Sequence, residues 1–234
     1  MPLPQNKMCV FNQTTGAPIW NFTTETPLWS SPAVADGLVF FAEYGVPGRV
    51  WALTETTGAT VWPQEIPNSL IVSTPAVADG RVFIGTRDAA PTPSMVIALN
   101  EFSGAVEWTF PTTSTVSSSP AVDSDNHLVV VGDEAGYVYG LNEIDGTPVW
   151  SRRLSSYQIN MSSPAISNNG LVFIGSTDGR IYCLNETNGQ IVWSYQTMGE
   201  IISSPAIVED HVLIGSKDGT LYCFGPPFPT HNVA

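Results

Sequence analysis

Positively charged residues are scarce in this sequence, and their scarcity excludes several kinds of partner. The 234-residue chain has 8 Lys and Arg against 21 Asp and Glu, which gives a formal net charge of −13 at pH 7. A chain of this charge has no basic stripe for a phosphate backbone, so we expect no nucleic-acid partner. No run of about 18 apolar residues occurs, so we expect no membrane-spanning helix. No basic segment followed by an apolar one opens the sequence, so we expect no signal peptide in it.

Cysteine and histidine are also sparse, and their spacing is not that of a metal site. The cysteines form no CxxC pair and the histidines stand apart; they are Cys9, Cys183 and Cys223, and His127, His211 and His231. We therefore expect no metal and no cofactor. We expect the cysteines to pack as small residues in equivalent strands, with a disulfide or a reactive thiol as the alternative.

An internal repeat is the main feature of the sequence. A Ser-Ser/Thr-Pro-Ala-Val/Ile segment recurs every 41 to 45 residues, with its proline at Pro32, Pro75, Pro120, Pro164 and Pro205. A second series consists of tryptophans that each follow a glycine by four residues, at Trp20, Trp62, Trp108, Trp150 and Trp193. Two series with such regular spacing indicate a repeated structural unit.

One unit, residues 162–195, predicts four short strands. Residues 162–166, 171–175, 180–184 and 190–195 are rich in β-branched and aromatic residues. Asn169-Gly170 and Asp178-Gly179 lie between them and are typical of tight hairpin turns. No segment has a helical period, so the pattern predicts an all-β protein.

Four antiparallel strands in each repeat of about 40–45 residues predict the blades of a β-propeller. We expect the tryptophan to fill the wedge between neighbouring blades. We expect the glycine before it to allow a left-handed turn. The whole chain, 1–234, is interpreted as a single propeller domain, with repeats near 29–67, 72–111, 117–154 and 161–198, and a last one at 199–225 completed by 7–22.

The stretch from Ile174 to Trp193, IGSTDGRIYCLNETNGQIVW, resembles the pyrroloquinoline-quinone-type propeller repeat. The resemblance covers residues 8–225 and implies the propeller fold. The family includes quinoprotein alcohol dehydrogenases, a lipoprotein scaffold of outer-membrane barrel assembly and repeat-rich surface proteins. It therefore implies no single function, because the fold hosts enzymes and non-enzymes.

The sequence departs from the quinoprotein dehydrogenases of that family. The resemblance implies eight-bladed rings of more than twice this length, with a vicinal cysteine pair over the cofactor. This chain has five repeats and no adjacent cysteines. We therefore expect no quinone-dependent dehydrogenase. The family aspartate that ends the third strand is replaced mostly by asparagine, at Asn12, Asn100, Asn142 and Asn185, which can cap its own turn.

The strands at the two ends of the sequence allow more than one closure of the ring. The N-terminus supplies a third-strand segment, 7–11, and a fourth, 18–22, whereas the C-terminus supplies three strands and no tryptophan. The simplest interpretation lends the Trp20 strand to the last blade and closes five blades, which leaves one surplus strand. The alternatives are a piece of a larger ring or assembly with a second copy, because an unclosed ring exposes two blade faces.

Loops on one face of the propeller, between second and third and between fourth and first strands, are the candidate binding surface. The hairpin of 43–49 is longer by two residues than its counterpart at 176–180, and 86–94 is longer by five than 176–179. Insertions on one face of a repeat protein commonly build its binding surface. Charged and tyrosine side chains gather there, and we predict binding through Glu43, Tyr44, Arg49, Arg87, Asp88, Asp133, Arg152, Tyr157, Glu200 and Lys217. The alternative is that hairpin tips are polar because they are solvated.

Catalysis is less favoured by the residues present. The Ser-Ser/Thr pairs line the predicted channel, but no histidine lies near them to act as a base. Glu43, Asp88, Asp133 and Glu200 could converge at the channel mouth as paired carboxylates. The first hypothesis is therefore a non-enzymatic propeller that binds a small molecule, glycan or protein at its loop face. The second is a hydrolase or lyase with a carboxylate site, and the third a shortened quinoprotein-like module without its cofactor.

Possible glycosylation motifs bear on the location of the protein. Four Asn-x-Ser/Thr sequons begin at Asn12, Asn21, Asn160 and Asn185. Turn chemistry also selects Asn and Thr, so most of this pattern follows from the turns. With the low lysine content, the sequons favour an extracellular or cell-surface protein.

Overall fold

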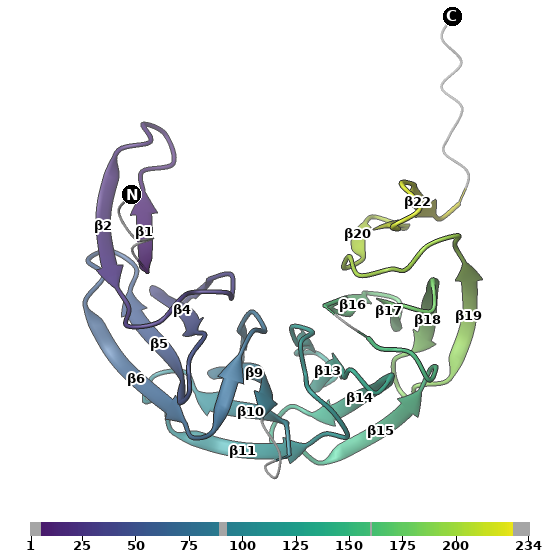
Figure 1. The fold of residues 1–234 in the computed structure, drawn as a ribbon, viewed down its shortest axis with the longest axis horizontal. Coiled ribbons are helices and arrows are strands. Elements are labelled where there is room, and N and C mark those ends of the chain that lie inside the picture. Colours follow the sequence, from purple (N-terminus) through teal and green to yellow (C-terminus); the bar gives the residue numbers. More distant parts are fainter. Residues whose placement is uncertain (1–5, 89–92, 160, 227–234) are drawn as a thin grey trace, which may run out of the picture.

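The computed structural model describes residues 6–88, 93–159 and 161–226, and these form an arc of antiparallel sheets (Figure 1). Every regular element in this part of the chain is a β-strand. The all-β class and the four-stranded blades predicted from the sequence are confirmed. Within the described ranges, no helix is long and apolar enough to cross a membrane.

Blades 1 to 4 each contain a complete set of four strands, and their bounds recur with the repeat. Blade 1 is β3 (Ala33–Ala35), β4 (Leu38–Glu43), β5 (Gly48–Thr54) and β6 (Thr60–Ile66). Blade 2 is β8 (Ala76–Ala78), β9 (Arg81–Asp88), β10 (Met95–Asn100) and β11 (Val106–Pro111). Blade 3 is β12 (Ala121–Asp123), β13 (Leu128–Gly132), β14 (Tyr137–Asn142) and β15 (Pro148–Arg153). Blade 4 is β16 (Ala165–Ser167), β17 (Leu171–Gly175), β18 (Arg180–Asn185) and β19 (Ile191–Gln196).

Two incomplete sheets form the ends of the arc. The N-terminal sheet is β1 (Lys7–Phe11) with β2 (Pro18–Thr23), and the C-terminal sheet is β20 (Ala206–Val208), β21 (His211–Gly215) and β22 (Leu221–Phe224). Blade 2 gains a further strand, β7 (Ser69–Ile71), which pairs with the last three residues of β9. The insertion predicted at 86–94 thus begins as an extension of β9 and not as a free loop.

The predicted closure of the ring is not formed, and this corrects the expectation that β2 completes the last blade. β2 pairs with β1 along residues 7–23, and β22 pairs with β21. The two end sheets lie at opposite tips of the arc (Figure 1). The physical reason is the surplus strand: β1 already satisfies the edge of β2, so the two form half a blade stacked on blade 1.

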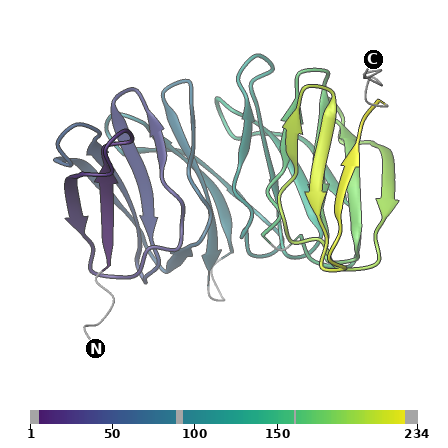
Figure 2. The ribbon, with the colours of Figure 1, turned by 90° about the horizontal axis from the view of Figure 1, so that it is seen from above.

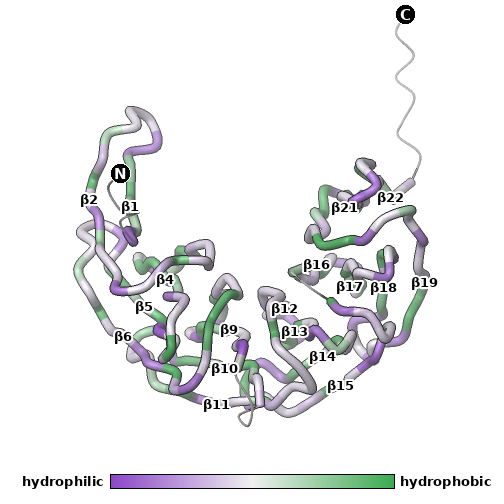
Figure 3. Tube along the Cα trace, viewed as in Figure 1, coloured by the Kyte–Doolittle hydropathy of each residue, from purple (hydrophilic) through white to green (hydrophobic). Residues whose placement is uncertain are grey.

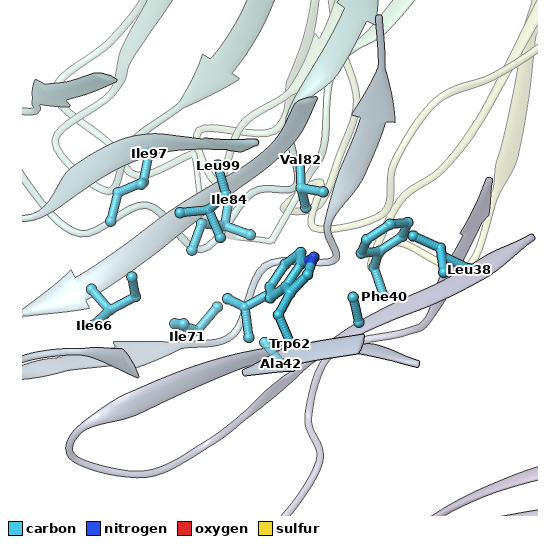
Figure 4. Packing of buried hydrophobic residues seen from close by; sticks show 12 residues of the cluster. Leu38, Phe40, Ala42, Trp62, Ile66, Ile71, Val82, Ile84, Ile97 and Leu99 are labelled. Carbon is cyan, nitrogen blue, oxygen red and sulfur yellow. The ribbon is translucent and has the colours of Figure 1, made fainter. Parts of the chain in front are cut away.

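The apolar core is divided into clusters between neighbouring sheets. Figure 4 shows the cluster between blades 1 and 2, where Phe40 and Trp62 face Val82, Ile84 and Leu99 of the next blade. Further clusters join the other successive sheets. The apolar residues therefore follow the stacked strands of each blade (Figure 3). Stacking explains why β4 is buried at every position: both of its faces are covered by other sheets.

The repeated tryptophan links each blade to the next. The indole nitrogen of Trp62 donates to the backbone oxygen of Glu101 at 2.8 Å, and Trp108 does the same to Glu143 at 2.9 Å. A Cβ added to Gly104 would lie 2.6 Å from the ring of Trp62. Gly104 also has a φ of +71°, so the glycine serves both the left-handed turn and the close approach of the preceding blade's ring.

The arc has two opposite rims, seen edge-on in Figure 2. We call one the loop face: it carries the hairpins 44–47, 133–136, 176–179 and 216–220 and the connections between blades, such as 24–32, 112–120 and 197–205. We call the other the turn face: it carries the turns 36–37, 79–80, 124–127 and 168–170 and the turns 101–105, 143–147 and 186–190. Every candidate site described below lies on one of these two rims or on the wall between blades.

Candidate functional site

Glu43 and Arg49 form an ion-pair cluster at the loop-face end of blade 1. The two residues are cross-strand partners in β4 and β5, which places both side chains beside the loop that enters the blade. Arg49 lies 3.6 Å from the Glu43 carboxylate, 3.4 Å from Glu25 and 2.7 Å from Glu65. The hydrogen bond to Glu65 raises the pKa of Arg49. Glu43 is buried and accepts a further bond from the Glu25 amide, so this cluster fixes the loop to the blade.

Asp133 is buried at the loop-face end of blade 3 and is fully engaged by its own blade. Its Oδ2 accepts from the Tyr139 hydroxyl at 2.8 Å and from the Ser114 amide at 3.1 Å. Its Oδ1 accepts from the amides of Ala135 and Tyr137. Burial raises the pKa of Tyr139 to about 12, so its hydroxyl remains a donor at neutral pH. Asp133 therefore shapes the hairpin that presents the loop face.

Glu200 and Lys217 form an exposed pair on the loop face at the C-terminal end of the arc. Lys217 Nζ lies 2.7 Å from the Glu200 carboxylate. Both side chains are about half exposed (51% and 53%), and a pair this exposed contributes little to stability, about 0–1 kcal/mol. Of the predicted charges described so far, these two are the most available to a ligand.

Arg152 does not reach the loop face, and its predicted place is corrected to the wall between blades 3 and 4. Its Nε donates to the carbonyl of Gly189 at 3.1 Å, in a turn on the opposite rim. The reason is the direction of its long side chain, which runs back along β15 toward the tryptophan contact.

The remaining predicted residues lie on or near the loop face. The ring of Tyr44 stacks on Trp29, with centroids 3.9 Å apart and planes 6° apart. Tyr157 is exposed in the connection after blade 3. Arg87 is exposed in β9, and the backbone of Asp88 pairs with Ser69. Residues 89–92 of the predicted insertion, and Asn160 of one sequon, lie outside the described residues.

The serine pairs serve the fold. The first serine of each pair bonds its own blade: Ser118 Oγ donates to the Gly132 carbonyl at 2.8 Å and accepts from the Gly132 amide at 2.9 Å. The second hydroxyl joins neighbouring blades, as when the Ser119 amide donates to Ser163 Oγ at 2.9 Å. These hydroxyls form a ladder of hydrogen bonds along the inner strands.

Exposed apolar side chains on the loop face are a feature that sequence reasoning found only in part, since Tyr157 was predicted there and the others were not. We call the following set the apolar rim: Trp29, Val46, Tyr157, Met161 and Met198. Their exposed fractions run from 60% to 94%, the highest being that of Met198. All lie in loop-face hairpins or connections. The signal available in the sequence was their position between predicted strands. An apolar residue in a loop lies outside the strand pattern that buries side chains between blades.

Pairs of carboxylates on the turn face are the second feature that the sequence did not reveal. At each junction between two complete blades, an aspartate of one blade faces a buried glutamate of the next, in the pairs Asp36 and Glu101, Asp79 and Glu143, and Asp123 and Glu186. Burial raises the pKa of all three glutamates, that of Glu186 to about 7, with a further contribution from Asp123 in that pair. The hydrogen bond from Glu186 lowers the pKa of Asp123. The last pair borders a hollow of about 320 Å³.

The family is decided by the match to known sequences. Residues 5–224 match the model of the family described as outer membrane protein assembly factor BamB. The chain belongs to the BamB family. The resemblance to pyrroloquinoline-quinone-type repeats is thereby confirmed, and it extends over nearly the whole BamB-like arc.

Two solved structures share the fold, and one curated protein matches part of the sequence; all three are longer than this chain. BamB from Moraxella catarrhalis aligns with a TM-score of 0.75 at 20% identity, over 93% of this chain and 67% of that one. A europium-containing methanol dehydrogenase aligns with a TM-score of 0.71 at 13% identity, over 87% of this chain and 51% of that one. Tetrathionate hydrolase of Acidithiobacillus ferrooxidans is 27% identical over 153 residues, 56% of this chain and 30% of that protein. The chain thus spans less than a third of that relative's length.

Proposed function

We propose that this chain is a binding or scaffold segment of a BamB-type propeller that recognises a protein partner through its loop face. The observation that carries the proposal is the apolar rim, because several loops of this face hold large aromatic and methionine side chains in solvent. Aromatic residues and Met are enriched at protein interfaces, and Met adapts to varied partner surfaces.

The charges beside the apolar rim support a protein partner over a small anion. Arg49 is neutralised by three carboxylates, and Lys217 is paired with Glu200. An anionic small molecule would have to displace these partners. A protein partner instead covers Trp29 and Met198. It leaves these ion pairs at the periphery of the interface, where charges set the orientation of the partner. The predicted binding residues Tyr44, Tyr157, Glu200 and Lys217 form part of this surface.

A displayed peptide library selected on the intact chain tests the proposal. We expect selected peptides to lose at least tenfold in affinity on Trp29→Ala or Met198→Ala. Phe102→Ala is the matched control, because Phe102 is 59% exposed on the turn face. Peptides that are insensitive to the two rim variants, or that are lost with Phe102→Ala, contradict the proposal.

Hydrolysis is the second candidate function, and the similarity to tetrathionate hydrolase is the observation that favours it. The predicted carboxylate site at the channel mouth gives it little support, since Glu43 and Asp133 are already bound by their own blades. Incubation of the chain with tetrathionate, followed by chromatography of the sulfur products, distinguishes the two. Turnover that is lost in Glu43→Gln or Asp133→Asn would replace the binding proposal with an enzymatic one.

A further inference from the structure

Three side chains with metal-ligating atoms meet on the turn face where blades 2 and 3 join. Asp79 comes from the turn between β8 and β9, His127 from the turn between β12 and β13, and Glu143 from the turn after β14. One ligand atom from each lies within 4.8 Å of the others. Two blades thus contribute to one cluster, on the rim opposite the proposed partner surface.

Glu143 is the observation that distinguishes this cluster from a group of surface acids. Its side chain is fully buried. Its Oε2 lies 3.4 Å from His127 Nδ1, whereas its Oε1 has no hydrogen-bond partner among the described residues, as is also true of Oε1 of Glu101 and Glu186 at the sister junctions. A buried carboxylate oxygen without a partner is costly. A cation bound between the three side chains would satisfy it.

The neighbouring junctions show what is special about this one. In each of these junctions, the backbone amide of the buried glutamate donates to the carbonyl of the last turn residue before the blade's second strand. The pairs are Glu101 with Gly80, Glu143 with His127 and Glu186 with Gly170. The two sister positions are therefore glycine, and only here among the described junctions does an imidazole stand in that place. His127 adopts it with a φ of +49°, a left-handed conformation that glycine adopts more easily.

We propose that Asp79, His127 and Glu143 bind a divalent transition-metal ion, of which Zn²⁺ is the representative, and so fasten blade 2 to blade 3. An imidazole with two carboxylates is a donor set that suits Zn²⁺, whereas Ca²⁺ takes six to eight oxygens. The negative charge of the two carboxylates exceeds the positive charge of the nearby Arg81, and Arg81 Nε is already paired with the Glu107 carboxylate at 2.6 Å. The site is independent of the proposed partner surface.

Calorimetric titration of the full chain with Zn²⁺ tests the proposal. We expect one site in the wild type, and at least a tenfold loss of affinity in His127→Gly. This variant restores the glycine of the sister junctions, so it is suited to the backbone and removes only the imidazole. Glu143→Gln should lose affinity equally. Glu186→Gln, which makes the same change at the next junction, is the matched control and should bind Zn²⁺ as the wild type does.

Two further measurements make the result decisive. Zn²⁺ should raise the thermal midpoint of the wild type and of Glu186→Gln, but not that of His127→Gly. Co²⁺ used as a probe should give visible bands without the charge-transfer band of a thiolate ligand. Unchanged Zn²⁺ affinity in His127→Gly overturns the proposal. So does a thiolate band, which would place the metal on the exposed Cys9 or Cys223, and so does tighter binding of Ca²⁺ than of Zn²⁺.

Discussion

The buried pair of Asp123 and Glu186 predicts a pH-dependent stability with a definite sign. Glu186 is 2% exposed, and burial together with Asp123 raises its pKa from 4.5 to about 7. Between these values the folded state holds a proton that the unfolded state has released. The free energy of unfolding therefore falls as the pH rises from 4.5 through about 7. The groups that face Glu186 are Asp123 and Asn126, from the end of β12 and the turn after it.

The size of this change in the free energy of unfolding follows from the pKa shift of Glu186. A shift of this size corresponds to roughly 3 kcal/mol at about 1.4 kcal/mol for each unit of pKa. The pair borders a solvent-accessible hollow, and screening there reduces the figure, so we expect about 2 kcal/mol. Glu186→Gln removes the titration but keeps a donor for the Asp123 carboxylate. The variant should equal the wild type at pH 5 and exceed it by about 2 kcal/mol at pH 8.

Urea unfolding at pH 5, 6, 7 and 8, followed by tryptophan fluorescence, measures this difference. Glu55→Gln is the matched control, because Glu55 occupies the same turn position in blade 1 and is exposed. It removes the same charge from an acidic protein and should leave the pH slope as in the wild type. An unchanged slope in Glu186→Gln, or an equal change in Glu55→Gln, would refute the reasoning.

Three more predictions address packing and reactivity. Gly104→Ala should lower the free energy of unfolding in urea by about 3 kcal/mol, because the added Cβ meets the Trp62 ring. Gly16→Ala, at a φ of +70° but with open space around it, should lower it by only about 1 kcal/mol. Equal losses in the two variants would contradict the contact between blades. Ser118→Ala should destabilise by about 2 kcal/mol, because both of its bonds to Gly132 are buried; a loss under about 0.5 kcal/mol would exclude that role. Burial raises the pKa of Cys183 to about 11, so a thiol reagent at pH 8 should modify Cys9 and Cys223 quickly and Cys183 only after unfolding.

The blades could be predicted from the sequence because their determinants are local and repeated. Residues 171–175 are predicted as a strand and form β17 with those bounds. The tryptophan was predicted to fill the wedge between blades, and the glycine four residues before it was predicted to allow a left-handed turn; both predictions are confirmed. The contact itself joins different repeats, since Trp62 meets Gly104 and not Gly58. A periodic sequence specifies such a contact as soon as stacking is assumed, because every blade has the same neighbours.

The state of the ring and the cluster of metal-ligating side chains could not be predicted from the sequence. Both depend on which strand pairs with a free strand edge or which turn of another blade lies beside a given turn. The strand of Trp20 could pair with the last blade or with 7–11, and both pairings satisfy its hydrogen bonds; the structure has the second. Asp79, His127 and Glu143 are 48 and 16 residues apart, a spacing typical of no metal motif. Blade stacking alone brings their turns together.

The repeat offers a physical reason to look for function where the units differ. A residue that recurs from blade to blade, such as the glutamate that is buried after the third strand in blades 2 to 4, is explained by the stacking that these blades share. His127 replaces a glycine of the sister turns and accepts a left-handed backbone to do so. The apolar rim likewise places Met198 in solvent, where it contributes nothing to its own blade. Stacking does not account for either departure, so each points to an interaction with something outside the chain.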